Sequence, residues 1–163
     1  MTMGFAARAA LTTALLALCA GMAATPTANA DNQRLNNGVL ANVYTMQHQA
    51  GCTTEIKGDR RLVEAARRQA FDAVNNPDLN GDLGSDGSTP QTRANDAGFV
   101  GTVAQTVATN PALAINGIDI LGQWYWDPVA KGIIENCANT VIGVWTENSL
   151  SRSVTVAVYG QPA

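Results

Sequence analysis

Residues 80–99 read NGDLGSDGSTPQTRANDAGF and are the most informative part of this chain. Its composition is that of a tight loop that leads into a short helix. Gly87 follows an aspartate and can take the positive φ that a turn requires. Ser88 and Gln91 have the spacing of a capping box, and Pro90 stands in the first helical turn, where its missing N–H costs little. We therefore expect a loop that ends in a helix N-terminus.

Two helices are expected before this loop, because apolar residues recur there at helical spacing. On the first helix they are Leu35, Val39, Val43, Met46 and Ala50. On the second, which Asp59 can cap, they are Leu62, Ala65, Ala66, Ala70 and Ala73. Gln69 lies in the middle of this second apolar face, and a buried amide needs hydrogen-bond partners. It either lines a polar cavity or connects two backbone segments.

Three strands are expected after the loop. Residues 100–108 alternate as a strand does, and residues 142–145 and 154–158 form a hairpin. Between them, the pair Asn110-Pro111 indicates a helix start, and Asn116-Gly117 weakens that helix.

Three aromatic residues follow this segment, at positions 124 to 126. Trp124 is expected in the core. One of Tyr125 and Trp126 is expected at the rim of a groove, because an aromatic side chain can present an apolar surface to a ligand.

The first 30 residues have the pattern of a secretory signal peptide. Arg8 precedes an apolar run from Ala9 to Ala24, and the small residues at positions 28–30 predict cleavage before Asp31. The apolar run is too short and wrongly flanked for a membrane span. The mature chain, residues 31–163, is then one domain of 133 residues without a transmembrane segment.

Two cysteines remain in the mature chain. A disulfide between Cys52 and Cys137 is favoured because the chain crosses into an oxidising compartment; two unpaired buried thiols are the alternative. Cys19 lies in the leader, where the preceding Leu18 argues against lipid attachment. The localisation expected is secreted, in the extracellular space or at the cell envelope.

The charge balance excludes some partners. The mature chain carries nine basic and thirteen acidic residues, which argues against nucleic acid or an anionic membrane surface as the main partner. The chain has one histidine, His48, on the side of the first helix opposite its apolar arc. Ser-His-Asp or Cys-His catalysis is therefore not expected.

Residues 80–99 resemble a motif of the bacterial SCP domain of the CAP superfamily, the cysteine-rich secretory, antigen 5 and plant pathogenesis-related proteins. There the segment usually reads His-x-Gly-Ser-Asp-Gly-Ser-x-x-x-x-Arg; here Asp82 stands at the His position. The resemblance covers essentially residues 31–163. It implies an α+β fold, an α-β-α sandwich in which helices flank a small antiparallel sheet.

The resemblance also implies a central cleft in which two His and two Glu can hold a divalent metal. Here Asp82 and Ala130 take the His positions, and Gln105 and Asp127 take the Glu positions. Zinc sites need imidazole or thiolate ligands, so tight zinc binding and zinc-activated hydrolysis are not expected, and no cofactor is predicted. Asp82 and Asp127 could still hold calcium or magnesium weakly.

Three functions remain open at this stage. The first is a secreted, non-catalytic CAP domain whose cleft binds a lipid, an envelope glycan or a protein partner, with Gln69 and Trp126 beside the four cleft positions. The second is a hydrolase that uses Asp82 and Asp127 as its two carboxylates. The third is a structural envelope protein.

Overall fold

The computed structural model describes residues 28–79, 81–112 and 115–163. The predicted signal peptide, residues 1–30, lies outside these ranges except for its last three residues, which begin the first helix. Cleavage before Asp31 stays a prediction. Over the described ranges, every helix is too short or too polar to cross a membrane.

Four strands form one sheet in the order β1-β3-β4-β2. They are β1 (Lys57–Gly58), β2 (Gly101–Pro111), β3 (Val141–Asn148) and β4 (Arg152–Pro162). The β2–β4 and β3–β4 pairs are antiparallel, which confirms the predicted hairpin, and β1 pairs parallel with β3. The sheet is therefore mixed, whereas an antiparallel one was expected. Strand β1 has two residues, too few for an alternating pattern to indicate it.

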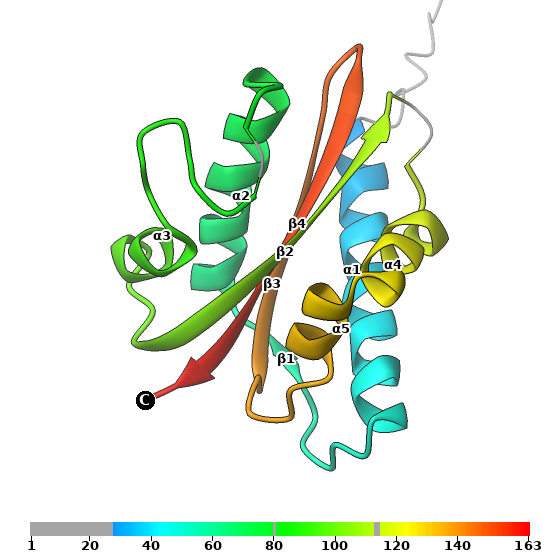
Figure 1. Cartoon of the computed structure of the whole chain (residues 1–163), viewed down its shortest axis with the longest axis vertical. Coiled ribbons are helices and arrows are strands. Elements are labelled where there is room, and N and C mark those ends of the chain that lie inside the picture. The colour runs from blue at the N-terminus through cyan, green and yellow to red at the C-terminus, as the bar shows by residue number, and fades with distance from the viewer. Residues whose placement is uncertain (1–27, 80, 113–114) are drawn as a thin grey trace, which may run out of the picture.

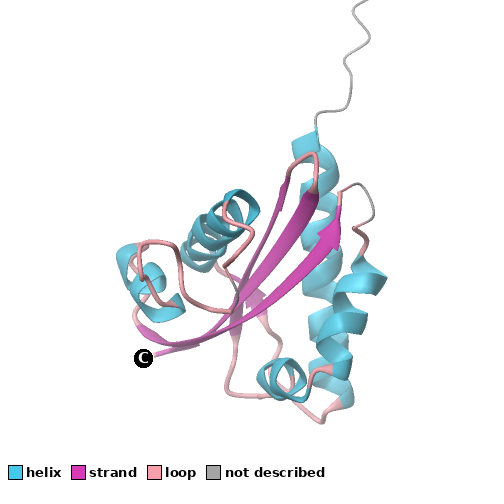
Figure 2. Cartoon of the chain, turned by 45° about the horizontal axis from the view of Figure 1, so that its top comes forward, coloured by secondary structure: helices cyan, strands magenta, loops and turns pink. Residues whose placement is uncertain are grey.

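Helices cover both faces of the sheet (Figures 1 and 2). On one face lie α2 (Arg60–Asn75) and α3 (Pro90–Asp96); on the other lie α1 (Ala28–Gln49), α4 (Gly117–Trp126) and α5 (Pro128–Ile134). A separate cluster of buried apolar side chains fills each interface. Trp124 belongs to the α1 side and is 2% exposed, as predicted. The α-β-α arrangement confirms the expected fold class.

The helix α2 lies against the backbone of the sheet. A Cβ at Gly143 of β3 would overlap the backbone of Leu62 and Val63, so only glycine permits this approach. The apolar face of α2 is rich in alanine, which keeps the layer thin. Asp59 caps α2 as predicted, by accepting a hydrogen bond from the backbone N–H of Arg61.

The helix after the quoted loop begins one residue later than expected. Its N-cap is Thr89, and the capping box joins Thr89 to Thr92, so the predicted box of Ser88 with Gln91 is wrong. Pro90 explains the shift: proline occupies the first helical position, and the N-cap is the residue before it. Ser88 instead accepts hydrogen bonds from Arg93.

The predicted helix start at Asn110-Pro111 is also wrong. Strand β2 continues through Pro111 and pairs with β4 along its whole length. Proline is tolerated there because β2 is an edge strand. Helix α4 begins after Asn116, whose side chain caps the helix by accepting a hydrogen bond from the N–H of Asp119. The pair Asn116-Gly117, which was expected to weaken a helix, therefore starts one.

The predicted disulfide is present. Cys52, just after α1, is bonded to Cys137, just after α5, and the two are 85 residues apart in sequence. The bond therefore joins two segments on the α1 side of the sheet that are far apart in sequence.

Candidate functional site

Hydrogen bonds connect the quoted loop to α2 before the chain reaches α3. The carboxylate of Asp72 accepts hydrogen bonds from the backbone N–H and the hydroxyl of Ser85, over 2.6 and 2.7 Å. Gly87 has a φ of 78°, as expected for the turn. Asp86 accepts from the N–H of Ser88, and the hydrogen bonds from Ser88 lower the pKa of the Asp86 carboxyl. The loop is thereby held in one shape.

Arg93 of α3 forms hydrogen bonds to several parts of this loop, and it is only 3% exposed. Its Nη1 donates to the backbone oxygen and the hydroxyl of Ser88, and its Nη2 donates to the backbone oxygen of Asp82 and to Oε1 of Gln105, all over 2.8–3.1 Å. Burial lowers the pKa of the Arg93 guanidinium, which keeps its charge because arginine is so basic. The arginine therefore holds Asp82 and Gln105 side by side.

Gln105 of β2 connects the two charged groups. It is 4% exposed; its Nε2 donates to Oδ1 of Asp82 over 3.1 Å, while its Oε1 accepts from Arg93. An amide has both a donor and an acceptor, whereas a carboxylate can only accept. Glutamine is thus the residue that suits a position between a carboxylate and a guanidinium.

Asp127 and Ala130 stand at the start of α5. The Oδ1 of Asp127 accepts from the backbone N–H groups of Val129 and Ala130, over 2.8 and 3.3 Å, and caps the helix. Ala130 is buried and its methyl side chain has no ligand atom. The carboxylate of Asp127 therefore stabilises the start of α5 in this chain.

The four positions that the resemblance assigns to the metal-binding His and Glu residues border one cavity. It measures about 480 Å³ and lies along the free edge of β2, between α2 with the quoted loop and α5. Asp82, Gln105, Asp127 and Ala130 all line it. The other lining residues are Ala73, Leu79, Gly81, Thr106, Val107, Thr109, Val129, Ile133 and Arg152.

The donor set of this cavity does not fit a zinc ion. One Asp82 oxygen accepts from Gln105, one Asp127 oxygen is taken by the helix cap, and the other two positions carry an amide and a methyl group. Zinc prefers imidazole and thiolate ligands. Throughout the described part of the chain, three His, Cys, Asp or Glu side chains never come close enough to share a metal ion.

Two predicted site residues lie outside the cavity. Gln69 is 1% exposed and its Nε2 points to the backbone oxygens of Gly81 and Leu83, over 3.5 and 3.4 Å, so it connects backbone segments of the loop. It borders a separate cavity of about 320 Å³ on the α2 side. Trp126 is 82% exposed and packs edge-on against Tyr125 one residue before the helix cap. Its role at a rim stays a prediction.

Sequence reasoning missed two residues of the site. Arg93 was only part of the quoted motif, although an arginine four residues into a short capped helix, preceded by several acids, could have indicated a buried hub. Arg152 of β4 lines the cavity and donates to the backbone oxygen of Ala73. Nothing local distinguishes Arg152 from a surface arginine, because it reaches the cavity only through the pairing of β4 with β2.

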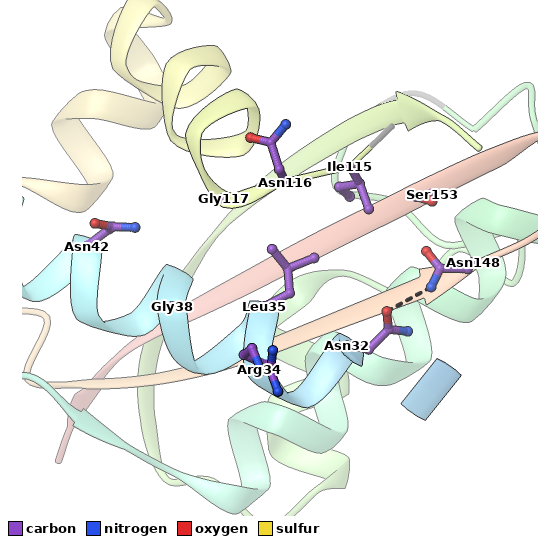
Figure 3. A pocket seen from close by; sticks show the side chains of 10 residues that line it. All are labelled: Asn32, Arg34, Leu35, Gly38, Asn42, Ile115, Asn116, Gly117, Asn148 and Ser153. Carbon is purple, nitrogen blue, oxygen red and sulfur yellow. Dashed lines mark hydrogen bonds between the residues drawn. The ribbon is translucent and has the colours of Figure 1, made fainter. Parts of the chain in front are cut away.

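A further cavity, of about 610 Å³, lies between the start of α1 and residues 115–117 (Figure 3). Leu35 points from α1 toward Ile115, and Asn148 donates to Oδ1 of Asn32 over 2.8 Å. Among the described residues that line it, one arginine is the sole ionisable side chain. The cavity along β2 is therefore the better candidate for a chemically specific site.

No family model matches the sequence, and no curated protein matches it. Solved structures do resemble the fold. An outer surface protein from Borrelia burgdorferi superposes with a TM-score of 0.67 at 15% identity, over 82% of this chain and 94% of the other.

A cysteine-rich secretory protein from Staphylococcus aureus superposes with a TM-score of 0.63 at 11% identity, over 80% of this chain. An extracellular protein from Bacillus anthracis that contains an SCP domain gives 0.58 at 14% identity, over 84% of this chain. This chain spans 39% and 45% of the lengths of those two proteins. By these likenesses and its α-β-α layers, the chain has the CAP/SCP superfamily fold.

Proposed function

We propose that this protein is a secreted, non-catalytic binding domain that takes a small ligand into the cavity along β2. One observation carries the proposal: the four positions that the resemblance assigns to metal ligands border a common cavity, while both polar atoms of Gln105 and one oxygen of each aspartate are engaged within the protein. Gln105 is hydrogen-bonded on both sides, and one oxygen of Asp127 caps α5. The cavity is present, and its donor set favours binding over a metal-assisted reaction.

The lining indicates the kind of ligand. A volume of about 480 Å³ lies within the ~300–1,000 Å³ typical of small-molecule sites. Ala73, Val107 and Ile133 provide an apolar wall, and Asp82 and Arg152 provide charged groups. A small molecule with an apolar body and a polar end, such as a lipid or a fragment of an envelope glycolipid, matches this lining. A glycan or a side chain of a protein partner would use the same wall.

The proposed location outside the cell rests on two observations. The leader has the pattern of a signal peptide, and two structural neighbours are named as a secretory and an extracellular protein. A place at the envelope, as the name of the Borrelia protein suggests for that protein, is a narrower form of the same proposal.

The test uses Thr109→Trp, which places an indole in the cavity. Thr109 is an exposed residue of β2 that lines the cavity, so the substitution fills the hollow without disturbing the core. Thr102→Trp is the matched control, because Thr102 is exposed on the same strand but does not line the cavity. The protein is secreted by its own host and measured by native mass spectrometry.

The wild type and the Thr102→Trp protein should carry the same added mass, and the Thr109→Trp protein should carry none. A wild type that is free of added mass when freshly secreted, or a mass that survives Thr109→Trp, contradicts the proposal. Hydrolysis of a peptide or glycan panel that disappears in Asp82→Asn/Asp127→Asn would contradict the non-catalytic part.

A further inference from the structure

The opposite edge of the sheet is only partly closed. Strand β1 covers the first two residues of β3 and then turns into α2, so β3 has no neighbouring strand from Gly143 to Asn148 on that side. Natural proteins protect such edges with charges, prolines or a covering segment, since unpaired backbone groups attract another strand. Between Gly143 and Asn148 there is no lysine, arginine or proline, and the one charged residue is Glu147, which accepts a hydrogen bond from Trp145.

Two hydrogen bonds show which backbone groups point to this edge. The oxygen of Ile142 accepts from the N–H of Asp59, and the oxygen of Thr146 accepts from the side chain of Asn32, over 2.8 and 3.2 Å. The N–H and C=O of alternate residues in a strand point to the same side. The N–H and C=O of Val144, midway between these two, therefore also face outward.

These groups of Val144 lack a partner within the described ranges of the chain. Val144 as a whole residue is only 5% exposed, and the space beside it is a groove that it helps to line. Buried backbone groups in proteins are nearly always paired with protein or with water. The edge therefore offers one backbone donor and one acceptor, at the spacing of a peptide unit, that no other segment of the described chain pairs.

A groove lies in front of these groups. It measures about 680 Å³ and is lined by Val144 and Trp145 of β3, by Val63 and Arg67 of α2, and by four amide side chains of α1, which are Asn32, Gln33, Asn36 and Asn37. Arg67 is paired with Glu64 through two hydrogen bonds, so its charge is balanced within the protein. Apart from this paired arginine, the walls are uncharged amides and apolar groups.

We propose that this groove binds a short extended peptide of a partner protein, which adds to the edge of β3 beyond the end of β1. A peptide strand offers the donor and acceptor that Val144 lacks, and strand addition of this kind is a recurring mode of peptide recognition. The balanced charges and amide walls select a peptide that is uncharged at its centre. The groove lies at the far edge of the sheet from the β2 cavity, so the two sites are independent.

The test starts from a library of capped, random seven-residue peptides displayed to the full chain processed by its host. Peptides that are enriched are resynthesised with single N-methyl groups, which remove one amide donor at a time. Methylation of amides that face β3 should weaken binding at least tenfold, and methylation of the intervening amides should have little effect. Amide hydrogen exchange of Val144 should slow when the peptide binds.

A pair of protein variants provides the matched control. Val144→Pro removes the outward N–H and spares the bonds to β4, whereas Val144→Ala keeps the N–H. Binding should be lost with proline and kept with alanine. If the proline variant does not fold, the N-methylated peptides decide alone.

Three outcomes overturn the proposal. The first is that the library yields no enriched peptide, and the second is that the enriched peptides bind equally well with every N-methyl group. The third outcome is that sedimentation shows a concentration-dependent dimer of the protein, which Val144→Pro abolishes. The last outcome would assign the edge to a second copy of this chain.

Discussion

Replacing Gln105 by glutamate would introduce the acid that the resemblance to SCP domains implies at this position, yet we expect it to destabilise this protein. The amide donates to Oδ1 of Asp82 and accepts from Arg93, each over 3.1 Å. Glutamate keeps the acceptor and loses the donor, so two carboxylates would face each other across the former hydrogen bond.

The magnitude follows from these two distances. At an effective dielectric constant of about 20, unit charges about 3 Å apart interact by roughly 5 kcal/mol. The attraction of the new carboxylate to Arg93 and its repulsion from Asp82 act over the same 3.1 Å and cancel to first order. The lost hydrogen bond to a charged group, about 1.5–3 kcal/mol, remains. We expect the free energy of unfolding to fall by about 2 kcal/mol at neutral pH.

The deficit should depend on pH. Because the effects of Asp82 and Arg93 on the introduced carboxyl cancel, burial at this position, which is 4% exposed, raises its pKa in the folded state above the unfolded value. A raised folded pKa contributes stability that is complete below the unfolded pKa and is lost as the pH rises through the folded pKa. The free energy of unfolding of Gln105→Glu should therefore approach that of the wild type at acidic pH, where the protonated carboxyl of residue 105 can again donate a hydrogen bond to Asp82.

Urea unfolding at pH values of about 7 and 4.5 measures both effects. The control is Asp82→Asn/Gln105→Glu, which exchanges the amide and the carboxylate, keeps one donor and one acceptor, and leaves the carboxylate beside Arg93. It should regain the stability of the wild type. The reasoning is refuted if Gln105→Glu is as stable as the wild type at neutral pH, or if the exchange is no better than the single substitution.

Three further predictions concern the scaffold. Gly143→Ala should cost more than about 3 kcal/mol in thermal or urea unfolding, because its Cβ would overlap the backbone of α2, whereas Gly132→Ala in α5 meets no atom and should gain about 0.5–1 kcal/mol; equal effects would contradict the packing. Replacing both cysteines of the disulfide by serine should cost about 4 kcal/mol for a separation of 85 residues, and an unchanged urea midpoint would argue against this. The hydrogen bond from Arg61 lowers the pKa of the Asp59 carboxyl, so its stabilisation is complete above the ordinary value near 3.8 and is lost as the pH falls through the lowered value. Asp59→Asn keeps the cap and should flatten the acid limb of the stability profile; an unaltered limb would exclude this contribution.

The positions around the β2 cavity could be named from the sequence because the motif fixes their spacing. Asp82 belongs to the quoted loop, and Asp127 and Ala130 surround a proline that starts a helix. What their side chains do could not be named. Asp127 is exposed and caps α5, and Gln69 connects loop backbone instead of lining the β2 cavity. Each of these outcomes depends on which backbone groups are nearby once the layers are packed.

The mistaken boundaries have a similar origin. Asn110-Pro111 has the local form of a helix start, but eleven consecutive pairs with β4 hold this segment in the sheet. Two-residue strand β1 has no periodicity at all and exists because β3 offers it backbone partners. Local preference amounts to a few tenths of a kcal/mol per residue, and a full ladder of pairing exceeds it.

By itself, the sequence determined the features that neighbouring residues create: the loop of residues 80–99, the capped start of α2, the hairpin, and the cysteines available to pair. Only the tertiary structure decided that Gln105 lies between Asp82 and Arg93, and that the edge of β3 stays open beside α1. The physical reason is that a hydrogen-bond partner or an unpaired strand edge is a property of segments far apart in the chain, which folding alone brings together.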